Sequence, residues 1–176
     1  MSSRPPFVVA PYAGETKQLL DLINDAYAVE TGNTGVAFKK TLRFDDVDEL
    51  DSLLRTSRCF AATDSVTGAL LGAIVWEMRN ASAFFGPFSV AQSAQGRGVG
   101  RELLDAVEDA AAAEGALSLN MTVINWRTDI IPMYERWGFV ATGVKPYDDH
   151  WRITRPCHFI AYSRAISRAK QPLTPV

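Results

Sequence analysis

A glycine-rich loop that runs directly into a helical segment constrains this chain more than any other feature of its sequence. The loop reads Gln95-Gly96-Arg97-Gly98-Val99-Gly100, and Arg101-Glu102-Leu103-Leu104 follow it at once. The first turn of a helix leaves backbone N–H groups without partners and carries partial positive charge, so it attracts anions. Because glycine lets a ligand approach the backbone closely, the loop predicts a pyrophosphate site, to which Arg97 and Arg101 add charge-assisted contacts. A glycine-rich turn that binds nothing is the alternative interpretation.

The spacing of the glycines excludes two common phosphate-binding patterns. The Walker loop ends in Gly-Lys-Ser/Thr, which this sequence lacks. The dinucleotide pattern needs two residues between its second and third glycines, whereas Val99 alone separates Gly98 from Gly100. What remains is the pattern Q-x-x-G-x-G, placed between an apolar strand-like run over residues 84–90 and a helix.

Composition places the chain among ordinary globular proteins with one domain. It has 176 residues, of which 47% are hydrophobic and 22% charged, and its formal net charge is −2. This charge gives no reason to expect nucleic acid or an anionic membrane as a partner. No apolar run approaches the roughly 20 residues that span a bilayer, and the N-terminus lacks the apolar core of a signal peptide. Because Cys59 and Cys157 lie far apart in the sequence, we expect reduced thiols, no metal site and a cytoplasmic protein.

Hydrophobic periodicity predicts strands and helices along the whole chain. Strands are expected over residues 7–10, 59–63, 70–78, 83–90, 117–123, 139–144 and 158–163, and helices over residues 16–27 and 47–54, after the glycine loop, and before Trp137-Gly138. Residues 31–35 predict a turn-rich break, and Pro132 predicts that the last helix starts no earlier than about Asp129, its expected N-cap. This order favours a mixed α/β fold with helices on both faces of one sheet.

A second motif follows the strand that comes after the glycine loop and its helix. It reads Met133-Tyr134-Glu135-Arg136-Trp137-Gly138-Phe139 and matches the pattern Y-E-x-x-G-F. In this order, the two motifs resemble those of the GNAT N-acetyltransferase superfamily, and the resemblance extends from about residue 69 to residue 165. It implies the GNAT acyl-CoA N-acyltransferase fold, a central mixed and mostly antiparallel sheet flanked by helices on both faces. It also implies a single N-acetyltransferase domain over residues 1–170, followed by a loose tail over residues 171–176.

The resemblance implies acetyl-CoA as cosubstrate, no metal, and a set of residues that bind CoA. Tyr134 is similar in position to the family's tyrosine that protonates the CoA sulfur, and a packing role in its helix is the alternative. The family's oxyanion donor is a backbone N–H on the strand before the loop. The residues implied to bind CoA are Phe88, Ser89, Val90, Gln95, Gly96, Arg97, Gly98, Val99, Gly100, Arg101, Asn125 and Arg127. Arg127 stands where many members have asparagine, so we expect it to hold a phosphate or a substrate carboxylate, or to be a surface arginine.

The sequence identifies the general base and the acceptor site less clearly than the residues that bind CoA. The strand over residues 83–90 has no histidine or carboxylate where some family members keep a base. Glu77 and His158 are the catalytic candidates, with Glu30 and His150 as further ones, and a water relay without a single base is the alternative. The resemblance places the acceptor between the first helices and the connection of the last two strands, lined by Tyr27, Glu30, Arg43, Tyr147, Asp148, His150 and Trp151. Aromatic rings there would fit the shape of an amine, and the acidic residues would bind its positive charge. Arg43 with Arg127 would hold a carboxylate of the acceptor.

These features predict an N-acetyltransferase that transfers the acetyl group of acetyl-CoA to a primary amine of a small molecule, by direct attack in a ternary complex. Two alternatives stay open: a protein N-terminal or lysine acetyltransferase, and a non-catalytic acyl-CoA-binding sensor domain. The sequence also leaves open the identity of the acceptor, the length of the acyl chain and a homodimer.

Overall fold

Strands and helices follow one another in the order that the sequence predicts. The computed structural model describes residues 6–34, 43–148, 153 and 156–167. Its elements are β1 (Phe7–Pro11), α1 (Thr16–Thr34), α2 (Val47–Leu54), β2 (Arg58–Asp64), β3 (Leu70–Arg79), β4 (Ser82–Val90), the 3₁₀ turn η1 (Gln92–Ala94), α3 (Val99–Ala113), β5 (Ser118–Ile124), α4 (Ile131–Arg136), β6 (Val140–Pro146) and β7 (His158–Ala165). The tail expected over residues 171–176 lies outside the described residues.

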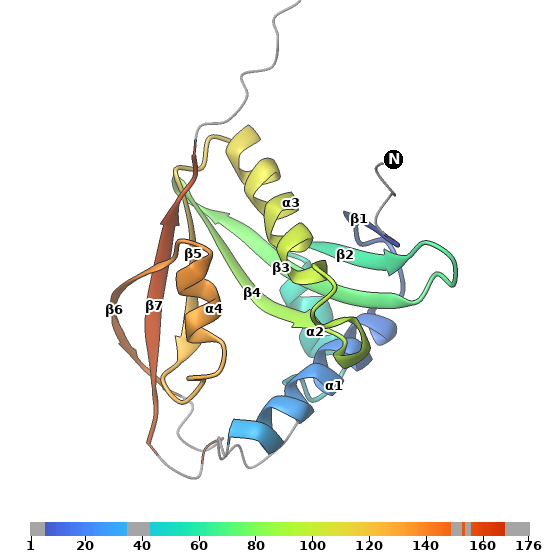
Figure 1. The fold of residues 1–176 in the computed structure, drawn as a ribbon, viewed down its shortest axis with the longest axis horizontal. Helices are drawn as coiled ribbons and strands as arrows, with labels where there is room; N and C mark the ends of the chain where they lie inside the picture. Colours follow the sequence, from blue (N-terminus) through green and yellow to red (C-terminus); the bar gives the residue numbers. More distant parts are fainter. Residues whose placement is uncertain (1–5, 35–42, 149–152, 154–155, 168–176) are drawn as a thin grey trace, which may run out of the picture.

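One sheet of seven strands organises the fold, in the order β1-β2-β3-β4-β5-β7-β6 (Figure 1). Neighbouring strands are antiparallel except for β4 and β5, which run parallel because α3 carries the chain back between them. The expected mixed and mostly antiparallel sheet is therefore confirmed.

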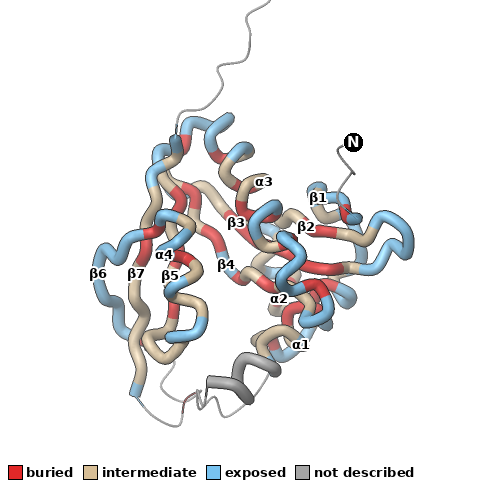
Figure 2. The backbone as a smooth tube through the Cα atoms, in the orientation of Figure 1, coloured by how far each residue is buried: buried red, intermediate tan, exposed pale blue. Residues whose placement is uncertain are grey.

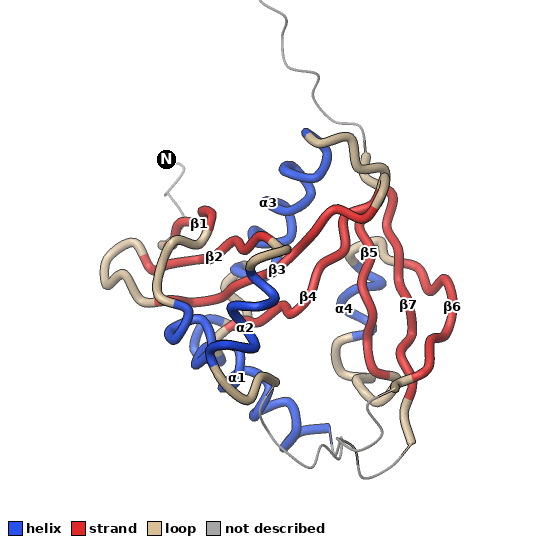
Figure 3. The backbone as a smooth tube through the Cα atoms, turned by 180° about the vertical axis from the view of Figure 1, so that it is seen from behind, coloured by secondary structure: helices blue, strands red, loops and turns tan. Residues whose placement is uncertain are grey.

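Two neighbouring residues of β3 show which helices cover which face of the sheet. A methyl group added to Gly72 would lie 3.0 Å from Val99 Cγ1, so this position faces α3. The next residue, Ala73, is buried in a cluster with Leu19 of α1 and Leu50 of α2. Because successive side chains of a strand point to opposite faces, α3 covers one face, and α1 with α2 covers the other (Figures 1 and 3). We call them the α3 face and the α1 face; α4 contributes to the core of the α3 face (Figure 2).

The helix α3 is the element that the sequence specifies most clearly. Its buried side chains recur at helical spacing and pack on the sheet, as the apolar pattern predicts. They are Val99, Leu103, Leu104, Val107 and Ala111. Gly115 follows the helix in the left-handed conformation, with a φ of 85°, as is common for a glycine at the C-terminal end of a helix.

Two local predictions were wrong. The helix α1 continues through residues 31–34, where a break was expected, because helix propagation adds a hydrogen bond per residue and Gly32 costs only about 1 kcal/mol. The N-cap of α4 is Ile130, without a side-chain cap, and not Asp129. The carboxylate of Asp129 accepts hydrogen bonds from Arg127 instead.

Candidate active site

The glycine loop lies at the N-terminus of α3 and leaves the backbone amides there uncapped. Gly98 is the N-cap, with a φ of 84°, and no side chain caps the helix. Intrahelical bonding begins with the N–H of Glu102, which donates to the carbonyl of Gly98 over 3.1 Å. The amides of the first turn therefore point out of the helix at its positive end, as an anion site requires. A methyl group added to Gly98 would meet no atom within 4 Å, so the space next to this residue is open to a ligand.

Two arginines flank this loop, and each is paired with a carboxylate at the surface. The Nη2 atom of Arg97 lies 3.8 Å from Oδ2 of Asp64, and Nε of Arg101 lies 2.9 Å from Oδ1 of Asp105. The arginine side chains are 36% and 47% exposed. Exposed ion pairs contribute at most about 1 kcal/mol, so either arginine can exchange its carboxylate for a phosphate at little cost.

The sheet is split between β4 and β5. The two strands pair only from Ser82 to Phe84 of β4, and beyond Phe84 they separate (Figures 1 and 3). Past this point β4 also bulges at Gly86-Pro87, where two of its residues face one residue of β3. The split and the bulge leave β4 and β5 unpaired beyond Phe84, so an opening lies between these two strands.

The edge of β4 that faces the split carries free backbone groups. The N–H of Ala91 donates to the carbonyl of Leu71 over 2.8 Å, and alternate residues of an antiparallel strand bond to the same neighbour. Ser89 therefore directs its backbone toward β3, whereas Phe88 and Val90 direct theirs into the split. Within the described part of the chain no strand pairs with these two residues on that side. Of the three strand residues predicted to bind CoA, Phe88 and Val90 have the required backbone orientation.

Tyr134 lies on α4 and packs across from the bulge of β4. Its ring centroid is 6.5 Å from that of Phe85, the residue just before the bulge, and 5.8 Å from those of Trp137 and Phe139. The side chain is buried, at 6% exposure. The packing role that was the alternative for Tyr134 is therefore observed, because an aromatic cluster beside the split holds the ring, and its role as an acid stays a prediction.

The turn after β5 contains Asn125 and Arg127, two of the residues predicted to bind CoA. The backbone N–H of Asn125 donates to the carbonyl of His158, and the N–H of His158 donates to Oδ1 of Asn125, each over 3.0 Å. Arg127 is only 13% exposed and binds Asp129 through both Nε and Nη2, so it is not a surface arginine. Burial raises the pKa of Asp129, but the hydrogen bonds and charge of Arg127 outweigh this and hold it below its ordinary value.

The two candidate bases lie at opposite ends of the split. Glu77 pairs with Phe84 across β3 and β4, at the closed end, and Oε1 of Glu77 accepts a hydrogen bond of 2.9 Å from Nε of Arg79. His158 begins β7 beside the end of β5, where the split is open. Glu30 lies on the last turns of α1, and His150 lies outside the described residues.

The structure describes part of the acceptor wall, which is the set of residues predicted to line the acceptor. Arg43 stacks its guanidinium 4.7 Å from the ring centroid of Phe44 and 6.0 Å from that of Tyr27, so the structure brings these two predicted residues together. Tyr147 is buried, with its ring 5.2 Å from that of Phe159, and Asp148 beside it is exposed. Trp151, like His150, lies outside the described residues.

Arg164 was not predicted from the sequence, although it connects three elements around the site. It donates from Nη1 to the backbone carbonyl of Trp137 over 2.9 Å, at the C-terminal end of α4, and pairs with Glu108 of α3. Its guanidinium lies 4.9 Å from the ring centroid of Phe139. Burial lowers the pKa of Arg164. The sequence does contain a signal for this residue. If the predicted strand over residues 158–163 is extended by one residue, Arg164 is a charged residue on the inward-facing side of that strand.

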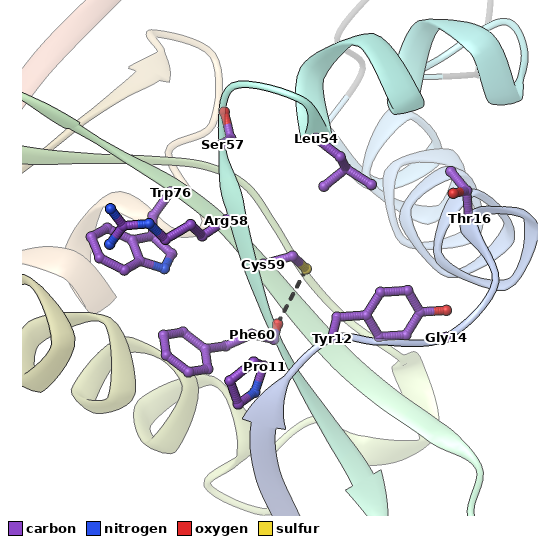
Figure 4. A pocket seen from close by; sticks show the side chains of 10 residues that line it. All are labelled: Pro11, Tyr12, Gly14, Thr16, Leu54, Ser57, Arg58, Cys59, Phe60 and Trp76. Atoms are coloured by element: carbon purple, nitrogen blue, oxygen red, sulfur yellow. Dashed lines mark hydrogen bonds between the residues drawn. The ribbon is translucent and has the colours of Figure 1, made fainter.

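A cavity of about 350 Å³ opens on the other side of β3, beside β1 and β2 (Figure 4). Its lining combines Phe60 and Trp76, which belong to the α3 face, with Cys59, which packs with the α1 face. It contains none of the residues predicted for the site. Burial raises the pKa of the Cys59 thiol to about 12. The split, and not this cavity, is therefore the candidate active site.

The described residues include neither a metal-binding group nor a membrane-spanning helix. No group of three or more His, Cys, Asp and Glu residues in the described ranges is arranged to hold a metal ion. Among the helices that the structure describes, none is long and apolar enough to cross a membrane.

A sheet split beside an uncapped helix N-terminus gives this α/β protein donors for an anion and a free strand edge for an extended ligand. A family model described as "Acetyltransferase (GNAT) family" matches residues 18–139. The chain belongs to this family, whose members are acyltransferases that use acetyl-CoA.

Solved structures with the same fold are similar to almost the whole chain. The ribosomal-protein-S18-alanine N-acetyltransferase of Escherichia coli matches with a TM-score of 0.70 at 17% identity, over 96% of this chain and 99% of its own. Nourseothricin acetyltransferase matches with a TM-score of 0.70 at 21% identity, over 92% and 99%. A GNAT acetyltransferase from Elizabethkingia anophelis, solved with acetyl-CoA bound, matches with a TM-score of 0.69 at 16% identity, over 92% and 99%. A comparison with curated protein sequences gives no significant match.

Proposed function

We propose that this protein transfers the acetyl group of acetyl-CoA to the primary amine of a small molecule, by direct attack in a ternary complex. The observation that carries the proposal is the free edge of β4. Phe88 and Val90 turn their backbone groups into the split, while the ring of Tyr134 packs 6.5 Å from that of Phe85, just before the bulge. These contacts support a carbonyl-binding N–H on one side of the opening and an O–H donor on the other.

The residues around the split fit CoA. The uncapped amides after Gly98 supply donors for a pyrophosphate, and Arg97 and Arg101 supply charge next to them. The pantetheine arm resembles a peptide, so its amides can pair with the free groups of Phe88 and Val90, as an added strand would. When bound, acetyl-CoA supplies an activated acetyl group on a thiolate leaving group.

The chain's own groups have two tasks in the transfer. As the amine nitrogen bonds to the acetyl carbon and the carbon–sulfur bond breaks, negative charge develops first on the carbonyl oxygen and then on sulfur. The N–H of Phe88 stabilises the first charge, and the phenol of Tyr134 donates its proton to the sulfur. The amine loses one proton, which we assign to bound water because Glu77 is already paired with Arg79.

The choice of a small amine is supported by the crowded aromatic contacts at the acceptor wall. Tyr27 is tied to Arg43, and Tyr147 is packed on Phe159, so the described part of this wall is made of rings held close together. One structural relative is named for a ribosomal protein acceptor and another for nourseothricin, so a protein acceptor is the main competing possibility.

A thiol-release screen with acetyl-CoA tests the proposal. Its arms are small primary amines, a peptide with a free N-terminal alanine, a peptide with an internal lysine, and no acceptor. Rapid release with small amines supports the proposal. Release only with a peptide assigns the protein to the acetyltransferases of polypeptides, and tight binding of acetyl-CoA without release in any arm makes it a sensor domain.

A further inference from the structure

Lys145 lies on the outermost strand, β6, yet its ammonium reaches toward β4. The strand order places β7 and β5 between these two strands, and three strand spacings amount to about 14 Å. This is more than a lysine side chain can span. Lys145 Nζ nevertheless lies 5.5 Å from the ring centroid of Phe84. The lysine side chain, although exposed, therefore lies across the face of the sheet toward β4.

The ring of Phe84 marks the closed end of the split. Phe84 is the last residue of β4 that pairs with β5. The next residue, Phe85, belongs to the core under α3 and α4, so Phe84 points to the opposite side, the α1 face. The glycine loop and α3 lie on the α3 face, so Lys145 and Phe84 lie on the face that the proposed CoA site leaves to the acceptor.

The charges around this ring do not cancel. The guanidinium of Arg79 lies 4.5 Å from the ring centroid of Phe84, but Glu77 accepts its hydrogen bond and offsets its charge. Lys145 has no carboxylate partner among the residues that the structure describes. An aromatic ring attracts an ammonium group but accepts none of its hydrogen bonds well, so the three N–H donors of Lys145 stay available.

We propose that Lys145, held against Phe84, binds a carboxylate of the acceptor, so that the substrate is an amine with an acidic group, such as an amino acid. This inference rests on the proposed function and names the substrate class of that same site. It also replaces the expected pair of Arg43 and Arg127, because Arg127 is occupied by Asp129. A compact ammonium group suits this role, since a charge-assisted hydrogen bond fixes one end of the acceptor while the amine attacks.

The test compares amino acids with their carboxamides as acceptors, in the wild type and in Lys145→Met, with thiol release as the readout. We expect the wild type to prefer the acids, and Lys145→Met to lower kcat/KM for the acids about tenfold, mainly through KM, while the amides are unaffected. Lys145→Arg should retain most of the preference. Lys17→Met is the matched control, because Lys17 is an exposed lysine on α1 paired with Asp21, far along the sequence from β6.

Each result separates this inference from the proposed function. Equal use of acids and amides by the wild type, or equal losses for both in Lys145→Met, overturns the carboxylate site while leaving the acetyltransferase intact. A weaker Kd for acetyl-CoA in Lys145→Met, measured by calorimetry, also overturns it, because the cation then serves a CoA phosphate. Absence of thiol release with every acceptor, despite normal binding of acetyl-CoA, contradicts the proposed function itself.

Discussion

Replacing Gly98 with alanine should weaken CoA binding more than it weakens the fold. Gly98 holds a φ of 84°, and a methyl group there would meet no atom within 4 Å, so the cost is backbone strain and not a clash. For an L-residue this strain is roughly 1–2 kcal/mol. Because the loop is exposed, the free protein can relieve the strain by moving the loop. Binding of CoA must then restore the original loop conformation, so the strain lowers the affinity for CoA. The expected result is a Kd for CoA that is about 5–30 times weaker.

Gly68→Ala provides the matched control for this substitution. Gly68 has a φ of 72° and no atom within 4 Å of an added methyl group, but it lies in the turn between β2 and β3. It should lower the free energy of unfolding by roughly 1–2 kcal/mol and leave the Kd for CoA unchanged. Calorimetric titration and denaturant unfolding of both variants measure the two effects. A wild-type Kd in folded Gly98→Ala would refute the assignment of the loop to the phosphates.

Three further predictions follow from the described contacts. Tyr134→Phe should lower kcat about 100-fold without changing the Kd for acetyl-CoA, and full turnover would leave the hydroxyl no role as acid. The folded-state pKa of Asp129 is below its ordinary value, so its interaction with Arg127 stabilises the fold at a pH above the unfolded-state pKa of about 3.9. This stabilisation is lost as the pH falls through the folded-state pKa. Asp129→Asn should thus lower the thermal midpoint at pH 7 but not near pH 2, and an equal loss at both would contradict this. With Cys157 replaced by serine, Cys59, whose pKa is raised to about 12, should react with a thiol reagent at pH 8 roughly a thousandfold more slowly in the native than in the unfolded protein.

The order of elements and the glycine loop could be predicted because local chemistry decides them. The helical spacing of Val99, Leu103 and Val107 specifies α3, and the uncapped start of that helix follows from the glycines before it. The same patterns correctly give α2, and they place β3 and β4 within one residue of their observed ends. These features depend on residues that are close in the sequence.

The contacts that complete the site depend on tertiary geometry and could not be predicted. Lys145 reaches Phe84 across the two strands that separate β6 from β4, and no sequence pattern in β6 predicts this contact. Likewise, the pairing of Arg127 with Asp129 uses a residue that local rules favour as a helix cap. The hydrogen bond that Arg164 donates to the carbonyl of Trp137 forms only because the end of α4 lies against β7.

Transfer of a labelled acetyl group tests the proposed acetyltransferase activity most directly. The wild-type protein is mixed with acetyl-CoA carrying an isotopic label in the acetyl group and with a panel of amino acids, their amides and simple amines, and the products are identified by mass spectrometry. We expect labelled N-acetyl products that form at a rate set by the amine, with one CoA thiol released for each product, and a sharp fall in both in Tyr134→Phe. Acetyl-CoA that stays bound and intact, or thiol release that yields no acetylated amine, would contradict it.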